Sequence, residues 1–413
     1  MKLLFGGLPI YHQRLIRAVL KFYNIESEFL PEPDYEAFLI GRKYCSRGFC
    51  NPAYFTIGNL IKFLLEKKKK QEDINQYIYV TVGACGPCRF GMYIEEYKKA
   101  LKLAGLENFK IAVLDQENGY KLEGIEIKEP FWFIWNLGKA IMVGDILRSL
   151  RYKLIAYRKE NVTIENINQI LDKIISEFEK TFEKNPKLLN IFKTAYKTRK
   201  FIKGISTDLT KKVPKVMVIG EFWASSTEGY GNYKLHEYLL KNGFDVKAEY
   251  ITNWITYQFF IKRKERKVRK EQNLKSLTIM YLLENTIYII FEILRKIYYN
   301  LPDTLVKQKE LYKLALPYYD PLVVGGEGHL EVAKHIWGAK NNIDFVISVK
   351  PFGCMPSTQS DAINYKVSKD YNTLFISIET SGDGEVNVKN RVSMKMFEAK
   401  KRFENKLKKV NTI

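Results

Sequence analysis

YIYVTVG, at residues 77–83, is a short run of β-branched and aromatic residues, which predicts a buried strand. A loop with glycine and cysteine follows, and an amphipathic pattern over 93–104 then predicts a helix. KIAVL, at 110–114, is a second apolar run of strand length. A strand, a loop, a helix and a strand in this order form one unit of a parallel sheet with a right-handed crossover. The stretch therefore predicts an α/β fold.

The same alternation continues on both sides of this unit. Residues 2–5 predict a first strand, and VMVIG, at 216–220, opens a second series of strands and helices. Between these two series, and again before the last strands, the apolar pattern is helical. We therefore expect two parallel-sheet lobes with a helical linkage, divided as follows: first lobe 1–129, helical connector 130–213, and second lobe 214–413 with a helical, basic insertion at about 254–316.

The chain is strongly basic. Its 413 residues carry 67 Lys and Arg against 46 Asp and Glu, a formal net charge of +21. Such an excess first suggests nucleic acid as a partner. No zinc-finger spacing, aromatic RNA-binding motif or helix-turn-helix punctuation accompanies the basic runs, so we interpret most lysines as solvated helix faces. The exception is KRKERKVRK at 262–270, where seven basic residues in nine form a field that can steer an acidic partner.

Several classes of protein are excluded by the sequence. Five cysteines are too few for a disulfide scaffold, and the N-terminus reaches Arg14 too soon for a signal peptide. The apolar segments 131–156 and 277–297 are interrupted by charged residues, so we expect no membrane span and a reduced, cytoplasmic protein. The chain has no GxxxxGK[ST] loop, no GxGxxG after a strand and no HExxH, so the common nucleotide and zinc-hydrolase sites are unsupported.

Four of the cysteines lie in loops rich in glycine and proline. Cys85 and Cys88 form Cys-Gly-Pro-Cys directly after the strand at 77–83, and Cys354 follows the strand predicted at 345–349. Cys50 precedes Asn-Pro, just before a helical pattern that starts near Phe55. The carboxyl ends of parallel strands are where open α/β sheets bind ligands. These cysteines are therefore the candidate chemical site, whereas Cys45 has no such setting.

Four interpretations of these cysteines remain open on residue chemistry alone. They could be small buried residues in tight turns, which suits Cys45 best. CGPC after a strand is also the spacing of a thiol–disulfide pair, although Ala84 precedes it where an aromatic residue is expected. Structural zinc normally needs a second CxxC motif, which the chain lacks. Thiolates from three loops could instead hold an iron–sulfur cluster, and we rank this equal to dithiol chemistry.

Wider motifs connect the chain to a known family. The strings GRKY, CNP, TIGN, CGPCRFGMY, PFGCMP and SIET are spread over nearly the whole sequence. Together they resemble the 2-hydroxyglutaryl-CoA dehydratase D-component-like proteins of the benzoyl-CoA reductase and 2-hydroxyacyl-CoA dehydratase superfamily. More narrowly, they resemble the branch labelled CoA-substrate-specific enzyme activase-related. The matching positions are Leu30, Pro31, Gly41–Tyr44, Cys50–Pro52, Thr56–Asn59, Cys85–Tyr93, Gly326, Glu327, Val332–Lys334, Pro351–Pro356 and Ser377–Thr380.

The resemblance implies two flavodoxin-like (Rossmann-like) lobes that hold an oxygen-sensitive iron–sulfur cluster on cysteines from separate loops. Cys50, Cys85 and Cys354 would be the ligands of a [4Fe–4S] cluster, with Cys88 as a candidate further ligand; relatives carry a double-cubane cluster instead. An ATP-dependent activator ATPase with its own cluster would deliver single low-potential electrons for reduction or dehydration of a substrate. The resemblance also implies pairing with a homologous subunit or with a second copy.

Two further parts of the sequence are weaker candidates. Residues 325–329, GGEGH, form a glycine-rich loop before a helix, and Glu327 or His329 could move protons there, although an ordinary N-terminal helix turn is the favoured explanation. The loop after VMVIG contains Trp223, which could shield a cluster or belong to the core. No residue pattern for coenzyme A is present, so the resemblance does not transfer the substrate. The basic run 262–270 is the expected dock for an acidic electron-delivering partner.

Overall fold

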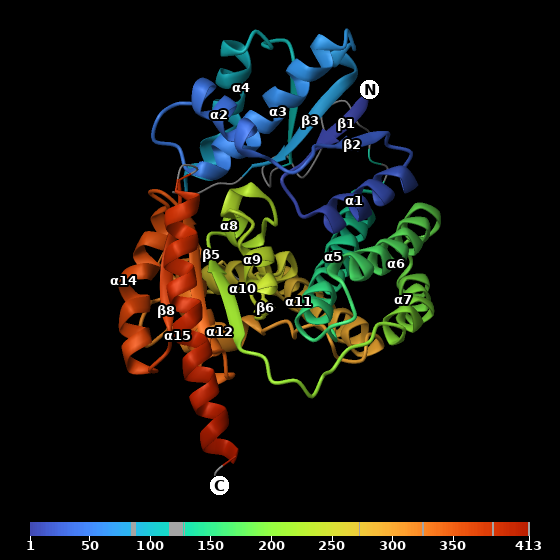
Figure 1. Ribbon diagram of the computed structural model, residues 1–413. Helices are drawn as coiled ribbons and strands as arrows, with labels where there is room; N and C mark the ends of the chain where they lie inside the picture. The colour runs from blue at the N-terminus through green and yellow to red at the C-terminus, as the bar shows by residue number, and fades with distance from the viewer. Residues whose placement is uncertain are drawn as a thin grey trace.

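The computed structural model describes residues 1–83, 88–114, 127, 129–271, 273–323, 326–381 and 384–411 (Figure 1). The fold class predicted from the sequence is confirmed. The protein is α/β, with 63% helix and two parallel four-stranded sheets between helices.

The first sheet has the strand order β2-β1-β3-β4, and all its pairs are parallel. The strand β3 is the YIYVTV run, whose first three residues are buried between β1 and β4. The elements of this lobe are β1 (Lys2–Phe5), α1 (Ile10–Phe22), β2 (Ser27–Phe29), α2 (Tyr35–Tyr44), α3 (Asn51–Lys69), η1 (Ile74–Gln76), β3 (Tyr77–Val82), η2 (Arg89–Met92), α4 (Tyr93–Leu103) and β4 (Lys110–Leu114).

The second sheet has the order β6-β5-β7-β8 and is also fully parallel. Its central strand β7 is buried along its whole length, as expected for a strand covered on both faces. Its elements are β5 (Lys215–Gly220), α8 (Phe222–Ser226), η3 (Tyr230–Asn232), α9 (Leu235–Lys241), β6 (Asp245–Lys247), α10 (Ile251–Val268), α11 (Leu274–Ile297), α12 (Gln308–Ala315), α13 (Gly328–Lys340), β7 (Phe345–Pro351), α14 (Met355–Asp370), β8 (Phe375–Thr380) and α15 (Glu385–Asn411).

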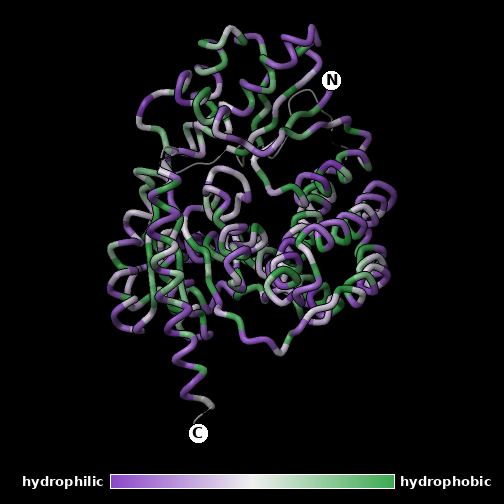
Figure 2. Tube along the Cα trace, viewed as in Figure 1, coloured by the Kyte–Doolittle hydropathy of each residue, from purple (hydrophilic) through white to green (hydrophobic). Residues whose placement is uncertain are grey.

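Both sheets follow one plan. Counted from its own first strand, each has the order 2-1-3-4, which is the order of the first four strands of a flavodoxin-type sheet. The last turns of α15 project from the body, and hydrophilic residues predominate along them (Figures 1 and 2). In flavodoxin-type sheets the ligand site lies beyond the carboxyl ends of the strands that flank the switch point. That edge is formed by β1 and β3 in the first lobe, and by β5 and β7 in the second.

Three long helices lie between the two series of strands in the chain, namely α5 (Pro130–Ala156), α6 (Ile164–Lys184) and α7 (Leu188–Lys203). The charges that interrupt the apolar segment of α5 are buried, and each has a partner. The Asp145 carboxylate accepts hydrogen bonds from the Thr252 backbone at 2.8 Å and from His12 at 3.1 Å. Lys139 donates to the carbonyl of Pro186, and Arg148 donates to that of Ser226. The charges thus fix α5 to its neighbours.

Asp145 in particular joins three parts of the chain. It lies on α5, it caps the start of α10 through Thr252, and it contacts His12 of α1. Burial alone would raise the pKa of Asp145, but His12 and the N–H groups of α10 outweigh it and lower that pKa. The carboxylate therefore stays charged and holds the insertion against the connector.

The helix α11 is the most apolar segment of the insertion. By length and composition alone it could cross a membrane, with a mean hydropathy of 1.5 over its most apolar window, of which 28% is buried. A single helix of this kind is weak support for a span. Leu282 and Ile289 lie exposed on its outer side.

Two elements of the first lobe, β2 and α2, were not predicted from the sequence. The strand β2 has only three residues, Ser27–Phe29, and all are half-buried at the edge of the sheet. So short and polar a segment has no apolar run to reveal it. The helix α2 was missed as well; it begins at Asp34, whose carboxylate accepts from the backbone of Ala37 at 2.8 Å. That bond is a standard N-cap, which the sequence Asp-Tyr-Glu-Ala could have indicated.

A buried histidine makes the stability of the second lobe sensitive to pH. His335 contacts Asn364 at 3.1 Å and Thr373 at 2.7 Å, and burial lowers its pKa from 6.5 to about 4. Between these values the unfolded chain binds the proton and the folded protein does not, so stability falls as the pH falls below 6.5. At about pH 5 the loss from His335 is about 2 kcal/mol.

We therefore expect the unfolding midpoint in urea to decrease between about pH 7 and pH 5, and the variant His335→Gln to lose part of this decrease. An equal decrease in the variant and in the unmodified protein would contradict the assignment.

Candidate functional site

Each cysteine of the predicted site that the structure describes lies immediately before a helix. Cys50 is the N-cap of α3, Cys88 precedes η2, and Cys354 is the N-cap of α14. The second helical position of both α3 and α14 is proline, which suits a first turn where the missing N–H is not needed. The N-terminal ends of α3 and α14 favour negative charge, so they would stabilise thiolates at Cys50 and Cys354.

Arg89 brings the loops of these cysteines together. Its Nη1 donates to the carbonyl oxygen of Gly48 at 2.9 Å, which joins the Cys88 and Cys50 loops of the first lobe. The same guanidinium lies against Gly353 of the second lobe, where an added Cβ would be 3.3 Å from Nη1. Gly353 also has a φ of +67°, a value that favours glycine. The three loops therefore meet where the two lobes face each other.

Glu221, directly after β5, interacts electrostatically with the same three cysteines. Its carboxylate accepts from the backbone N–H groups of Trp223 at 3.0 Å and Ala224 at 2.8 Å, and so begins α8. Burial is the largest cause of the raised pKa of Cys50, Cys88 and Cys354, and the negative charge of Glu221 raises all three further. The carboxylate is therefore within electrostatic reach of all three thiols. Burial raises the pKa of Glu221 itself to about 7.

The thiols of Cys50 and Cys354 are protonated near neutral pH when no metal ion is bound to them. Burial raises the pKa of Cys50 to about 11, although the Tyr93 hydroxyl at 2.8 Å from Sγ lowers it. Burial also raises the pKa of Cys354, which is 7% exposed. Buried, neutral thiols of this kind lose their protons when a soft metal binds. The donor chemistry therefore fits an iron–sulfur cluster or another thiolate-held metal.

Contacts next to the cysteines join the two lobes. The first turn of α3 docks on the second lobe, where the Asn51 side chain donates to the carbonyl of Thr380. The Trp223 indole donates to the carbonyl of Gly7 at 3.0 Å, and its ring lies 5.6 Å from that of Phe55. The carboxyl ends of β1 and β5 thus lie close to one another, and Trp223 is a buried wall between them.

The structure does not assemble a complete metal site from the residues it describes. Within 1–83, 88–114 and the later described ranges, no three His, Cys, Asp or Glu side chains come close enough to hold one metal ion. Cys85, the central predicted ligand, lies outside the described residues. Cys45 ends α2 and packs into the core of the first lobe, as expected for a structural residue. The ligand set of Cys50, Cys85, Cys88 and Cys354 stays a prediction.

Glu327 and His329, the two weaker candidates, have different surroundings. Glu327 is half-buried at the start of α13; burial, and then Glu221, raise its pKa to about 7, and its charge also acts on Cys88. Glu327 is therefore within electrostatic reach of Cys88. His329 is buried beside the rings of Tyr257 at 5.4 Å and Tyr319 at 6.2 Å, and burial lowers its pKa to about 4.

Sequence reasoning missed three residues of this site: Arg89, Tyr93 and Glu221. Glu221 was recognisable, because it follows the last residue of a buried parallel strand, where α/β sheets place ligands. Nothing local marks Arg89 or Tyr93, whose roles depend on Gly353 and Cys50 far away in the chain. Next to the site, the buried Glu331 was also missed; it accepts at 2.6 Å from the Ser357 hydroxyl, which contacts Cys354.

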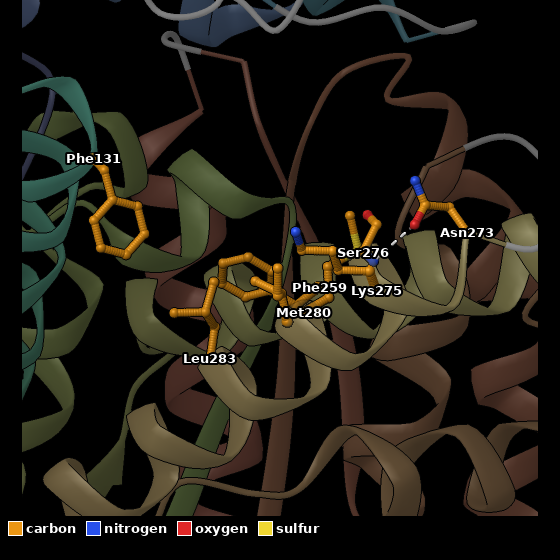
Figure 3. A pocket seen from close by; sticks show the side chains of 8 residues that line it. Phe131, Phe259, Asn273, Lys275, Ser276, Met280 and Leu283 are labelled. Atoms are coloured by element: carbon orange, nitrogen blue, oxygen red, sulfur yellow. Dashed lines mark hydrogen bonds between the residues drawn. The ribbon is translucent and has the colours of Figure 1, made fainter.

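A separate hollow of about 430 Å³ runs along the insertion (Figure 3). Its apolar walls come mainly from Phe259 of α10 and Met280 and Leu283 of α11, with Phe131 of α5 at one end. Lys275 is the one charged residue of its lining within the described part of the chain. Because its lining has no thiol or carboxylate, the hollow is distinct from the cysteine site.

The basic run 262–270 covers the last turns of α10 and the start of the turn that leads to α11. Two of its arginines act inside the hairpin of α10 and α11, since Arg263 pairs with Glu284 and Arg266 donates to Ser276 at 2.7 Å. Lys267, Arg269 and Lys270 are exposed at the tip. Only this tip, and not the whole run, presents its charge freely to a partner.

Comparison with other proteins adds no assignment. The chain matches no protein-family model, and no curated protein matches it.

Proposed function

We propose that this chain is an iron–sulfur redox protein of the 2-hydroxyacyl-CoA dehydratase and benzoyl-CoA reductase type. The observation that carries the proposal is the meeting of three cysteine loops, from both lobes, around Arg89. Structural cysteines in turns have no reason to converge across a lobe boundary. Ligands of one shared group do, because thiolates from separate loops hold such clusters.

In this proposal Cys50, Cys85 and Cys354 hold the cluster, and Cys88 is a further ligand. The cluster, a [4Fe–4S] or a double-cubane cluster, would supply one-electron reduction. The chain itself supplies the surroundings: Tyr93 covers the half-buried thiol of Cys50, Cys354 is buried, Cys88 is exposed, and the helix N-termini would offset the negative charge of the thiolates. Glu327, whose pKa is raised to about 7 by burial, is the proposed proton donor to a reduced substrate.

The partner in this proposal is an ATP-dependent activator that delivers the electrons, and a homologous subunit or a second copy completes the assembly. The compartment would be a reducing cytoplasm, where thiols stay free. The tip residues Lys267, Arg269 and Lys270 are the proposed dock, because exposed cations steer an acidic partner during encounter.

Reversing the charge of the tip should slow electron delivery. We expect the triple variant Lys267→Glu, Arg269→Glu, Lys270→Glu to reduce the rate of cluster reduction by the activator about tenfold at low salt, with less difference at high salt. The matched control is Lys68→Glu, Lys69→Glu, Lys70→Glu, which makes the same charge change at the exposed end of α3. Equal rates in the two variants would remove the dock from the proposal.

Anaerobic purification followed by iron and acid-labile sulfide analysis tests the proposed function. The expected result is a brown protein with about four iron atoms per chain, or more with a double-cubane cluster. A colourless protein that takes up no iron on reconstitution, and that forms a reversible Cys85–Cys88 disulfide, would replace the proposal with metal-free thiol–disulfide chemistry.

A further inference from the structure

Tyr93 contacts the thiol of Cys50. Its hydroxyl oxygen lies 2.8 Å from Sγ of Cys50, at a distance where either group can donate to the other. Tyr93 is the first residue of α4 and is only 6% exposed. Burial, and then the charge of Cys50, raise the pKa of Tyr93 well above its usual value, so the phenol keeps its proton. When Cys50 is a thiolate, Tyr93 is therefore the donor and the sulfur is the acceptor.

Aromatic packing fixes the Tyr93 ring. The ring of Phe90 meets it edge-on at 5.1 Å, and that of Phe49 lies 6.1 Å away. Phe49 directly precedes Cys50 in the chain, so the same packing holds the ring and the thiol together. Tyr93 also belongs to the buried core of the first lobe. A donor held in this way stays directed at the sulfur, because its side chain has already lost its conformational freedom.

Cys354, the ligand predicted in the second lobe, has a different neighbour. The hydroxyl beside it belongs to Ser357, at 3.4 Å from Sγ. That hydroxyl donates to the buried carboxylate of Glu331 at 2.6 Å, and a hydroxyl has only one proton to donate. Of these two hydroxyl groups in the described part of the chain, only that of Tyr93 has its proton available for a sulfur.

A hydrogen bond to a ligand sulfur affects the two oxidation states of an iron–sulfur cluster unequally. Reduction adds one negative charge to the cluster and its sulfurs, so a donor stabilises the reduced form more than the oxidised form. Buried surroundings strengthen the effect, because the local dielectric constant is low. Removing the donor therefore makes such a cluster harder to reduce.

We propose that Tyr93 sets the reduction potential of the cluster held by Cys50, by donating a hydrogen bond to the Cys50 sulfur. This role rests on the proposed function, because it needs an iron–sulfur cluster on Cys50. Tyr93 acts through Cys50 and is therefore a positioning residue. Its effect is to ease the single-electron reduction that the activator performs.

Redox titration of the anaerobically reconstituted protein, followed by electron paramagnetic resonance, tests this role. Tyr93→Phe keeps the ring and removes the hydroxyl, so the variant should fold and keep its iron. Its equilibrium constant for reduction should fall about tenfold, which corresponds to a midpoint potential about 59 mV more negative.

The matched control is Tyr97→Phe. Tyr97 lies one turn further along α4 and is also buried, and its hydroxyl contacts that of Tyr79 at 3.3 Å. This variant loses a buried hydroxyl as well, but it should keep the potential of the unmodified protein. Equal potentials in the two variants would overturn the role of Tyr93 and leave the proposed function standing. A protein that binds no iron would overturn both.

The hydrogen bond can also be measured without a cluster. In the metal-free protein the donor stabilises the Cys50 thiolate, which is the form that reacts with iodoacetamide. Below the pKa of the thiol, Tyr93→Phe should therefore slow the alkylation of Cys50 about tenfold, as followed by mass spectrometry of the labelled peptide. Tyr97→Phe should leave the rate unchanged. If both variants react at the rate of the unmodified protein, Tyr93 is not the donor and the proposal is overturned.

Discussion

Changing Cys354 to serine is expected to remove nearly all iron from the anaerobically purified protein. Cys354 is the cysteine that the second lobe contributes, and it lies at the start of α14 against Ser357, at 3.4 Å. A serine hydroxyl at this position keeps the shape of the loop but is a poor ligand for iron beside sulfide. With one lobe disconnected from the cluster, we expect iron per chain to fall at least about tenfold and the visible colour to disappear.

Cys45→Ser is the control for this prediction. Cys45 is buried in the first lobe, with 8% of its surface exposed against 7% for Cys354. The two substitutions should therefore have similar costs in packing. We expect Cys45→Ser to keep its full iron content. If both variants keep their iron, or if both lose it, the assignment of Cys354 as a ligand is wrong.

Changing Gly58 to alanine should strongly destabilise the first lobe. The helices α2 and α3 approach so closely that a Cβ at Gly58 would overlap the carbonyl oxygen of Ala37, and one at Gly41 would overlap that of Tyr54. Backbone atoms cannot turn aside as a flexible side chain does, so the helices would have to separate. We expect a loss of about 3 kcal/mol, measured as a lower midpoint of unfolding in urea.

Gly138→Ala is the matched control for the same change elsewhere. Gly138 lies within α5, and an added Cβ there would meet nothing within 4 Å. Alanine is the better helix former, so this variant should gain about 0.5–1 kcal/mol. A result in which Gly58→Ala unfolds like Gly138→Ala would contradict the close approach of α2 and α3. This approach also explains two glycines of the motifs at 41–44 and 56–59.

Apolar periodicity was sufficient to predict the architecture. The runs at 77–82 and 110–114 became paired strands β3 and β4, because β-branched and aromatic residues pack well on a pleated sheet. The helical stretch between the lobes was equally clear. The order of strands within each sheet was not predictable, because it depends on contacts between segments far apart in the chain.

The candidate site was predictable only where neighbouring residues in the sequence mark a functional position. Glycine and proline next to Cys50 and Cys354 marked both positions, and both proved to be helix N-caps. The contacts that join the loops, those of Arg89 with Gly48 and Gly353, are between residues more than 40 positions apart, and no spacing in the sequence encodes them. The sequence analysis treated all seven basic residues of 262–270 as a surface for a partner. Arg263 and Arg266 instead bond to residues within the hairpin of α10 and α11.

Electron paramagnetic resonance of the anaerobically reconstituted and reduced protein tests the central claim most directly. The account predicts a low-temperature signal from a reduced iron–sulfur cluster, which Cys354→Ser abolishes and Cys45→Ser preserves. The absence of any such signal in a folded protein that has been supplied with iron, sulfide and reductant would contradict it.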